Sequence, residues 1–173
     1  PVHVGEDVTV TLINAGHILG SACVVIESHG KKVLFTGDLG RSPAILVPTR
    51  ETVQGVDALV TESVYGNRVH GSVEESEETL KAAILEIVQK RGVLIIPAFS
   101  LERTQIILAA IDRMMGEGAI PQIPVFMDSP LASKVTHVYT QNPEFLSPAL
   151  KARLERGDDP FSFKTLTVTV NTE

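Results

Sequence analysis

Three short strand-like runs, each followed by a loop that carries an ionisable side chain, constrain the fold of this chain most. The runs cover residues 8–13, 33–35 and 58–61. The first alternates apolar residues and threonine, and the other two are almost entirely apolar, as expected of short β-strands bounded by turns. The loops that follow present His17, Asp38 and Glu62. The sequence therefore predicts a sheet with polar side chains at the ends of its strands.

Glycines flank two of these side chains. His17 lies between Gly16 and Gly20, and Asp38 lies between Gly37 and Gly40. Glycine permits the backbone conformations of tight loops, and such loops hold side chains at the rim of a sheet. A single histidine in a turn is most simply a polar surface residue, but a nearby carboxylate changes this interpretation, because imidazole and carboxylate are donors that zinc binds. If the three strands share one direction, we expect the three side chains to meet at one edge.

The hydrophobic period changes from two to 3.6 near residue 67. Ser72 and Glu75 form a capping box ahead of an apolar helical stripe, and Gly92 ends that helix. The pattern then predicts alternating strands and helices, which is typical of a parallel sheet. The predicted elements are a buried strand over 92–99, a helix capped by Ser100 that runs to residue 115, a strand over 123–127, a helix over 130–141, a short helix after Ser147-Pro148 and a strand over 165–170.

The segments AGHILGSA, FTGDLGR and TESVYGNRVH, with the later IIPAFSLERTQ and VFMDSPLA, resemble the metallo-β-lactamase-fold nucleases of the β-CASP branch, a group that includes ribonuclease J and the cleavage and polyadenylation endonuclease. The likeness covers most of residues 8–142. It implies an α/β fold in which a partial metallo-β-lactamase sheet is followed by a Rossmann-like β-CASP βαβ segment. We expect domains at 1–66 and 67–173.

The resemblance also implies roles for individual residues. His17 matches a metal-binding histidine, and Asp38 matches a catalytic carboxylate that bridges two zinc ions. Glu62 matches an acidic residue that supports the catalytic site. Arg68 and His70 lie in the segment that follows and are candidates for contacts with substrate phosphate. The implied activity is two-zinc hydrolysis of RNA phosphodiester bonds in RNA processing or decay.

Two features of the family pattern are absent from this sequence. The histidine-aspartate cluster expected upstream is missing, and so are the later histidine motifs. We therefore expect this chain to be the middle piece of a longer enzyme. A zinc site needs three or four protein ligands, and His17 and Asp38 supply two. The isolated 173 residues are expected to bind zinc weakly and to be inactive.

The composition bounds the remaining possibilities. With 15 basic and 21 acidic residues the net charge is -6, which is not the balance of a self-sufficient nucleic-acid binder. The single cysteine, Cys23, excludes an internal disulfide and suits the cytoplasm; its apolar strand indicates a core thiol. No run has the length of a membrane span. Unpaired sheet edges in a truncated sheet favour a homodimer.

Two alternative functions remain open at this point. A metallo-β-lactamase-fold hydrolase of another ester would fit the loops, although the βαβ segment argues against a simple hydrolase. A non-catalytic scaffold paralogue in an RNA-processing complex would also fit, although such relatives lose metal ligands, and His17 and Asp38 are present. The connection over 41–57, with Pro43 and Pro48, is interpreted as a crossing between strands without further role.

Overall fold

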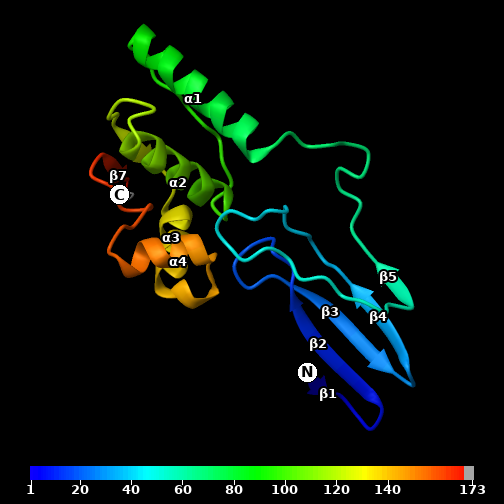
Figure 1. The fold of residues 1–173 in the computed structure, drawn as a ribbon. Coiled ribbons are helices and arrows are strands. Elements are labelled where there is room, and N and C mark those ends of the chain that lie inside the picture. The colour runs from blue at the N-terminus through cyan, green and yellow to red at the C-terminus, as the bar shows by residue number, and fades with distance from the viewer. Residues whose placement is uncertain (170–173) are drawn as a thin grey trace. The chain divides into compact units, whose positions relative to one another are not determined.

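A computed structural model describes residues 1–169 of the chain, which form two compact units (Figure 1). The first unit holds residues 1–66 together with 142–151, and the second holds 67–141 together with the residues from 152 onward. Ser147 joins 142–151 to the first unit: its N–H donates to the Leu46 carbonyl oxygen at 2.8 Å and its hydroxyl donates to the Ile45 carbonyl oxygen at 3.0 Å. The segment 142–151 contains a short 3-10 helix, Pro143–Phe145, and the start of α4, Pro148–Glu155.

The first unit is built on one sheet with the strand order β1-β2-β3-β4-β5. The strands are β1 (Val2–His3), β2 (Val8–Asn14), β3 (Ala22–Ser28), β4 (Lys31–Phe35) and β5 (Ala58–Val60). Both β2 and β4 run antiparallel to β3, and β5 runs parallel to β4. Three strands, β2, β4 and β5, therefore share one direction, which is the condition stated in the sequence analysis, and their C-terminal ends lie at one edge. Cys23 is buried in β3, and burial raises the pKa of its thiol.

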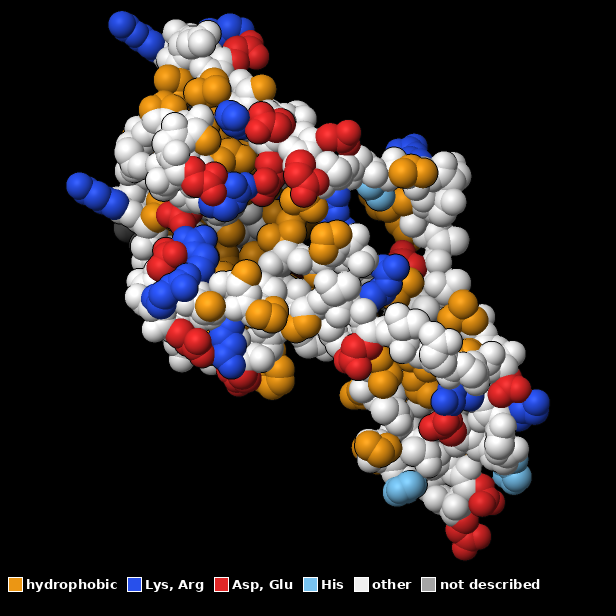
Figure 2. Space-filling model, in the orientation of Figure 1, with side chains coloured by type: hydrophobic (Ala, Val, Ile, Leu, Met, Phe, Trp, Pro, Cys, Tyr) orange, Lys and Arg blue, Asp and Glu red, His pale blue; other side chains and the backbone are white. Residues whose placement is uncertain are grey.

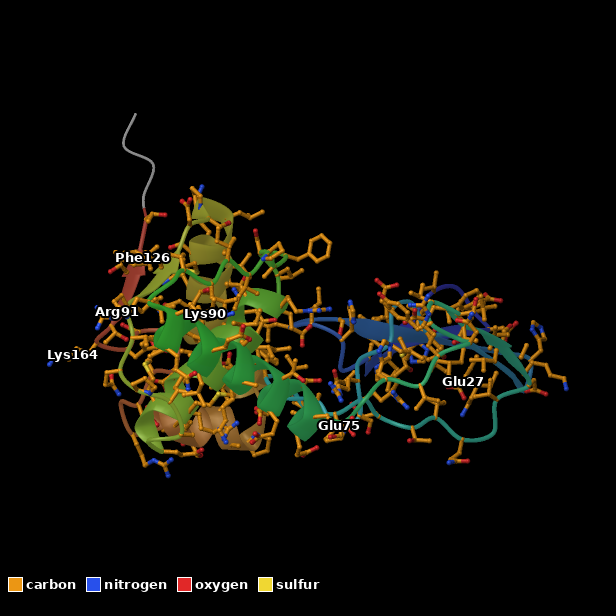
Figure 3. The ribbon with its side chains drawn as sticks, turned by 90° about the horizontal axis from the view of Figure 1, so that it is seen from above. Glu27, Glu75, Lys90, Arg91, Phe126 and Lys164 are labelled. Carbon is orange, nitrogen blue, oxygen red and sulfur yellow. The ribbon has the colours of Figure 1, made fainter. Side chains whose placement is uncertain are left out.

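The second unit packs helices around a small apolar core. Its helices are α1 (Val73–Lys90), α2 (Arg103–Gly116) and α3 (Pro130–Gln141). The capping box predicted at Ser72 and Glu75 is present, and Glu75 and Lys90 lie at opposite ends of α1, where each charge opposes the helix dipole (Figure 3). Ile84 of α1 packs with Ile111 and other apolar residues of α2 in the core of this unit.

Two parallel strands complete the second unit and confirm the α/β class. β6 (Val125–Met127) pairs with β7 (Leu166–Val168) in parallel. The strand predicted over 165–170 is shorter in the structure, and Val170 lies outside the described residues. None of the helices within residues 1–169 combines the length and the apolar character that a bilayer crossing requires.

The prediction of a buried strand over 92–99 is wrong. Residues 92–99 belong to no strand of the described chain, and all of them are exposed. Their exposed fractions alternate: Val93, Ile95 and Phe99 are each 83% exposed, whereas Leu94 and Ile96 are 37% and 38% exposed. The segment is apolar, but among the described residues no neighbouring strand supplies the ladder that would make it a sheet strand.

The start of α2 also differs from the prediction. Ser100 does not cap the helix, because its hydroxyl lies 3.2 Å from the hydroxyl of Ser129 and its carbonyl oxygen accepts a bond from the Gln105 side-chain amide at 3.1 Å. The helix begins at Arg103, after a tight turn in which the Arg103 N–H donates to the Leu101 carbonyl oxygen at 2.7 Å. Glu102, at the centre of this turn, has a φ of 60° and a ψ of -51°. Burial raises the pKa of Glu102 to about 7, although the Arg103 charge opposes the rise.

Candidate metal centre

The edge of the sheet where β2, β4 and β5 end carries the three side chains singled out from the sequence. His17 lies in the loop after β2, Asp38 in the loop after β4, and Glu62 directly after β5. Thr36 links two of these strand ends, because its N–H donates to the Val60 carbonyl oxygen at 2.9 Å and its hydroxyl lies 3.3 Å from that of Thr61. The shared strand direction brings the three loops to one edge, as expected if the strands are parallel to one another.

The Ser21 side chain bonds to the backbone of the loop that carries His17. The Ser21 hydroxyl accepts the N–H groups of His17 at 3.0 Å and Ile18 at 3.1 Å, and the Ser21 N–H donates to the Ile18 carbonyl oxygen at 3.0 Å. The Ala15 N–H donates to the Ser21 carbonyl oxygen at 3.2 Å and so closes the base of the loop. The backbone donors next to His17 are therefore satisfied within the loop, and its imidazole is left to face outward.

A contact between two glycines holds the His17 loop against the Asp38 loop. The Gly40 N–H donates to the Ala15 carbonyl oxygen at 3.0 Å. A Cβ atom at Gly40 would lie 1.6 Å from the Gly16 carbonyl oxygen and 2.5 Å from the His17 nitrogen. No residue other than glycine fits at position 40 without moving one of the loops, so the two backbones are in direct contact below His17 and Asp38.

This contact brings the His17 and Asp38 side chains together. His17 Nε2 lies 3.9 Å from Asp38 Oδ2, and the two side chains are 42% and 77% exposed. Two ligand atoms bound to one tetrahedral zinc at about 2.0–2.1 Å are roughly 3.3 Å apart. The observed separation is close enough that a small rotation of two exposed side chains would bring both atoms within reach of one ion. The pair therefore fits zinc as two of its ligands.

Two ligands do not complete a zinc site. Within residues 1–169, no three His, Cys, Asp or Glu side chains come together as a metal-binding group. A tetrahedral zinc site draws three or four ligands from the protein. His17 and Asp38 therefore supply part of a ligand set, and further donors are needed before the ion is held tightly.

The Glu62 side chain accepts a hydrogen bond from the backbone next to Asp38. Its Oε1 accepts the N–H of Leu39 at 2.5 Å, and its own N–H lies 3.4 Å from the Thr36 hydroxyl. The carboxylate is half-buried. By holding the peptide that follows Asp38, Glu62 fixes the direction in which the Asp38 side chain leaves the loop. This contact fits a supporting role better than that of a metal ligand.

Arg68 and His70 lie in the second unit, in the stretch that precedes α1, and both are exposed. Their assignment to substrate phosphate stays a prediction. The sequence analysis missed two other residues of the first unit, Asn14 and Arg50, whose side chains bond to the backbone around the His17 and Asp38 loops. An asparagine at the end of a strand, two residues before a glycine, favours a turn. No sequence pattern indicates a role for Arg50.

Comparison with known proteins identifies the family of the chain. The Beta-Casp domain model matches residues 104–173. An RNase J-like protein of Methanocaldococcus jannaschii is 32% identical over 161 residues, which cover 90% of this chain and 38% of the relative. The chain belongs to the β-CASP family.

Two further members of the β-CASP family show how much of each relative the chain matches. The cleavage and polyadenylation specificity factor subunit 3 of Dictyostelium discoideum is 33% identical over 159 residues, covering 91% of this chain and 20% of the relative. The endoribonuclease YSH1 of Mycosarcoma maydis is 31% identical over 156 residues, covering 89% of this chain and 18% of the relative. The chain thus spans between 18% and 38% of the length of these three relatives.

Proposed function

We propose that the protein to which these residues belong hydrolyses RNA phosphodiester bonds with two zinc ions, held in part by His17 and Asp38. One observation carries the proposal: an imidazole nitrogen and a carboxylate from separate loops lie 3.9 Å apart at one sheet edge. Three relatives whose names describe an RNase J-like protein, a cleavage and polyadenylation factor and an endoribonuclease support RNA as the substrate class.

Each residue of the edge has a distinct task in this proposal. When bound, a zinc pair supplies Lewis-acid polarisation of the phosphate and activation of the attacking water. His17 would supply an imidazole nitrogen to the metal site, and Asp38 would supply carboxylate oxygens. Glu62 holds the peptide after Asp38 through the Leu39 N–H and so keeps that carboxylate directed at the cations. We assign Arg68 and His70 to contacts with substrate phosphate.

The surface charge does not favour tight binding of RNA by the protein surface alone. On the face in Figure 2, acidic and basic side chains alternate and form no continuous basic surface. A net charge of -6 also makes binding through the phosphate backbone alone weak. We infer that the affinity for the reacting phosphate comes mainly from the metal pair, and that RNA cleavage depends steeply on metal occupancy.

The test is substitution of Asp38 in the whole protein. Asp38→Ala is expected to lower RNA cleavage roughly a thousandfold, because metal-based stabilisation of the reacting phosphate is worth several kcal/mol. Metal content, measured on the same sample, should fall below that of the unsubstituted protein. Asp7→Asn, in the loop that leads into the opposite end of β2, is the control and should change neither value. Cleavage at the normal rate with normal metal content in Asp38→Ala would remove the basis of the proposal.

We also propose that the protein acts in the cytoplasm, with Cys23 reduced, and that the isolated chain self-associates. The exposed apolar segment over 92–99 and the short edge strand β5 both present unpaired edges within the described residues. Light scattering after size exclusion tests the association: a mass of about 18.6 kDa at all concentrations would contradict it. Metal analysis of the dialysed chain tests the expectation of weak zinc binding, and one or two retained zinc ions would overturn it.

A further inference from the structure

The connection between β4 and β5 lies against the base of the His17 loop. The Asn14 side-chain amide donates to the carbonyl oxygens of Pro48 at 3.0 Å and Thr49 at 3.2 Å. The Glu51 N–H returns a bond to the Asn14 carbonyl oxygen at 3.1 Å. Asn14 also accepts the Gly16 N–H on its side-chain oxygen at 2.9 Å. Residues 48–51, which we call the strap, are thus bonded to the loop that carries His17.

Arg50 extends the strap to the second loop. Its guanidinium Nη1 donates to the Gly40 carbonyl oxygen at 2.8 Å, two residues after Asp38. Its backbone nitrogen lies so close to Gly16 that a Cβ atom there would be 2.5 Å away. Arg50 therefore contacts the His17 loop through its backbone and the Asp38 loop through its side chain. The two residues that it contacts, Gly16 and Gly40, also contact each other.

We propose that Arg50 is a positioning residue that fixes the His17 and Asp38 loops relative to one another, and so sets the distance between the two metal donors. The importance of this distance for metal binding rests on the proposed function, whereas the contact of Arg50 with the two loops does not. The geometry is specific to these loops, because the ladders of β2, β3 and β4 form without Arg50. The Gly40 N–H and carbonyl oxygen are held from opposite sides, by Ala15 and by Arg50, so the peptide groups on both sides of Gly40 are fixed.

An arginine suits this task because its long side chain reaches across from the strap while its charge strengthens a bond to a neutral carbonyl. A lysine at the same position would keep one charged donor but would lose the planar group. Methionine would keep most of the apolar length and remove the donor. Arg50→Met and Arg50→Lys therefore separate the hydrogen bond from the bulk of the side chain.

The first experiment measures amide hydrogen exchange by NMR in the metal-free 173-residue chain. Arg50→Met is expected to speed exchange of the Gly40 N–H by roughly tenfold, because losing a charge-assisted bond at a partly exposed site frees the Gly40 peptide to move. Arg50→Lys should recover part of the protection. The Cys23 N–H in β3 is the internal reference and should not change, and Arg156→Met controls for loss of a positive charge at an exposed position.

Unchanged Gly40 exchange in Arg50→Met would overturn the proposal, and so would equal acceleration at Gly40 and Cys23, which would indicate general destabilisation. If Arg50→Met does not fold, Arg50→Lys decides, because the proposal then requires Gly40 exchange faster than in the unsubstituted chain with Cys23 unaffected.

The second experiment measures zinc binding and RNA cleavage by the whole protein. Arg50→Met is expected to weaken zinc binding by about tenfold, as for other residues that orient metal ligands, and to lower kcat with KM unchanged. Arg50→Lys should restore part of the zinc affinity. A raised KM with normal zinc affinity would mean that Arg50 contacts the substrate, and would overturn the positioning role. The exchange measurement contains neither metal nor RNA, so it can succeed where Asp38→Ala refutes the proposed function, and the reverse also holds.

Discussion

Glu102 is the residue whose replacement should stabilise this chain most clearly. It occupies the centre of a tight turn closed by the Arg103 N–H and the Leu101 carbonyl oxygen at 2.7 Å, with φ of 60° and ψ of -51°. This is the rare, strained form of the γ-turn, and a side chain held in such a backbone region costs about 1–3 kcal/mol. Glycine adopts the same backbone conformation without the Cβ clash. Glycine also has more conformational freedom than glutamate in the unfolded chain, which stabilises the unfolded state by about 0.5–1 kcal/mol. The free energy of unfolding should therefore rise by about 1 kcal/mol in Glu102→Gly.

The carboxyl group of Glu102 adds a second, pH-dependent cost. Burial raises its pKa from 4.5 to about 7, with Arg103 opposing the rise. Below pH 4.5 the carboxyl is protonated in both states, and the cost is absent. As the pH rises from 4.5 to 7 the unfolded chain releases its proton first, so the free energy of unfolding falls, and above pH 7 the loss is complete. The full shift corresponds to about 3 kcal/mol, and access of water to the partly exposed group reduces this to about 1–2 kcal/mol.

Two substitutions separate these effects. Glu102→Gln keeps the side-chain length and removes the charge, so it should gain about 1 kcal/mol more at pH 8 than at pH 5. Glu102→Gly should show the same pH-dependent gain and a further increment of about 1 kcal/mol at both pH values. Urea unfolding followed by far-ultraviolet circular dichroism measures both, and Glu6→Gln, an exposed glutamate, is the matched control. Equal stabilities of the Gln and Gly variants would refute the strain argument, and a gain that is independent of pH would refute the argument from burial of the carboxyl.

Three other substitutions test the packing of the loops and of α1. Gly40→Ala should destabilise the first unit by several kcal/mol, because the new Cβ would lie 1.6 Å from the Gly16 carbonyl oxygen; Gly116→Ala, which meets no atom within 4 Å, is the control and should be neutral or slightly stabilising. Ser72→Ala should cost about 1 kcal/mol through loss of the α1 cap, measured by thermal unfolding, and an unchanged midpoint would contradict this. Glu62→Ala should speed exchange of the Leu39 N–H, and unchanged exchange would show that the carboxylate does not hold that peptide.

The candidate site was predictable where it depended on strand direction. One alternating run and two short apolar runs, separated by glycine-containing loops, located β2, β4 and β5 to within one or two residues at their ends. Because these three strands point the same way, the residues that follow them had to meet at one edge. The sequence predicted this convergence only on the condition that the three strands share one direction, and the pairing of the strands meets that condition.

The errors in the second unit have a different cause. An apolar run such as 92–99 predicts an extended, buried strand, but whether a neighbouring strand pairs with it depends on residues far away in the sequence. The start of α2 was predicted wrongly because serine is a common N-cap residue. In the structure, the Ser100 carbonyl oxygen accepts a bond from the Gln105 side chain, and the Ser100 hydroxyl lies next to that of Ser129. Local propensity could not reveal partners five and 29 residues away.

Arg50 shows why the spacing of the metal donors could not be read from the sequence. His17 and Asp38 are recognisable by residue type, but their 3.9 Å separation is set by backbone contacts among Gly16, Gly40 and Arg50. Since exposed side chains rotate freely, the loops themselves must carry the positional information for a metal site to be preorganised. Substitutions at Gly40 or Arg50 should therefore lower metal affinity while both donors remain in place. A site whose geometry resided in the side chains alone would tolerate them.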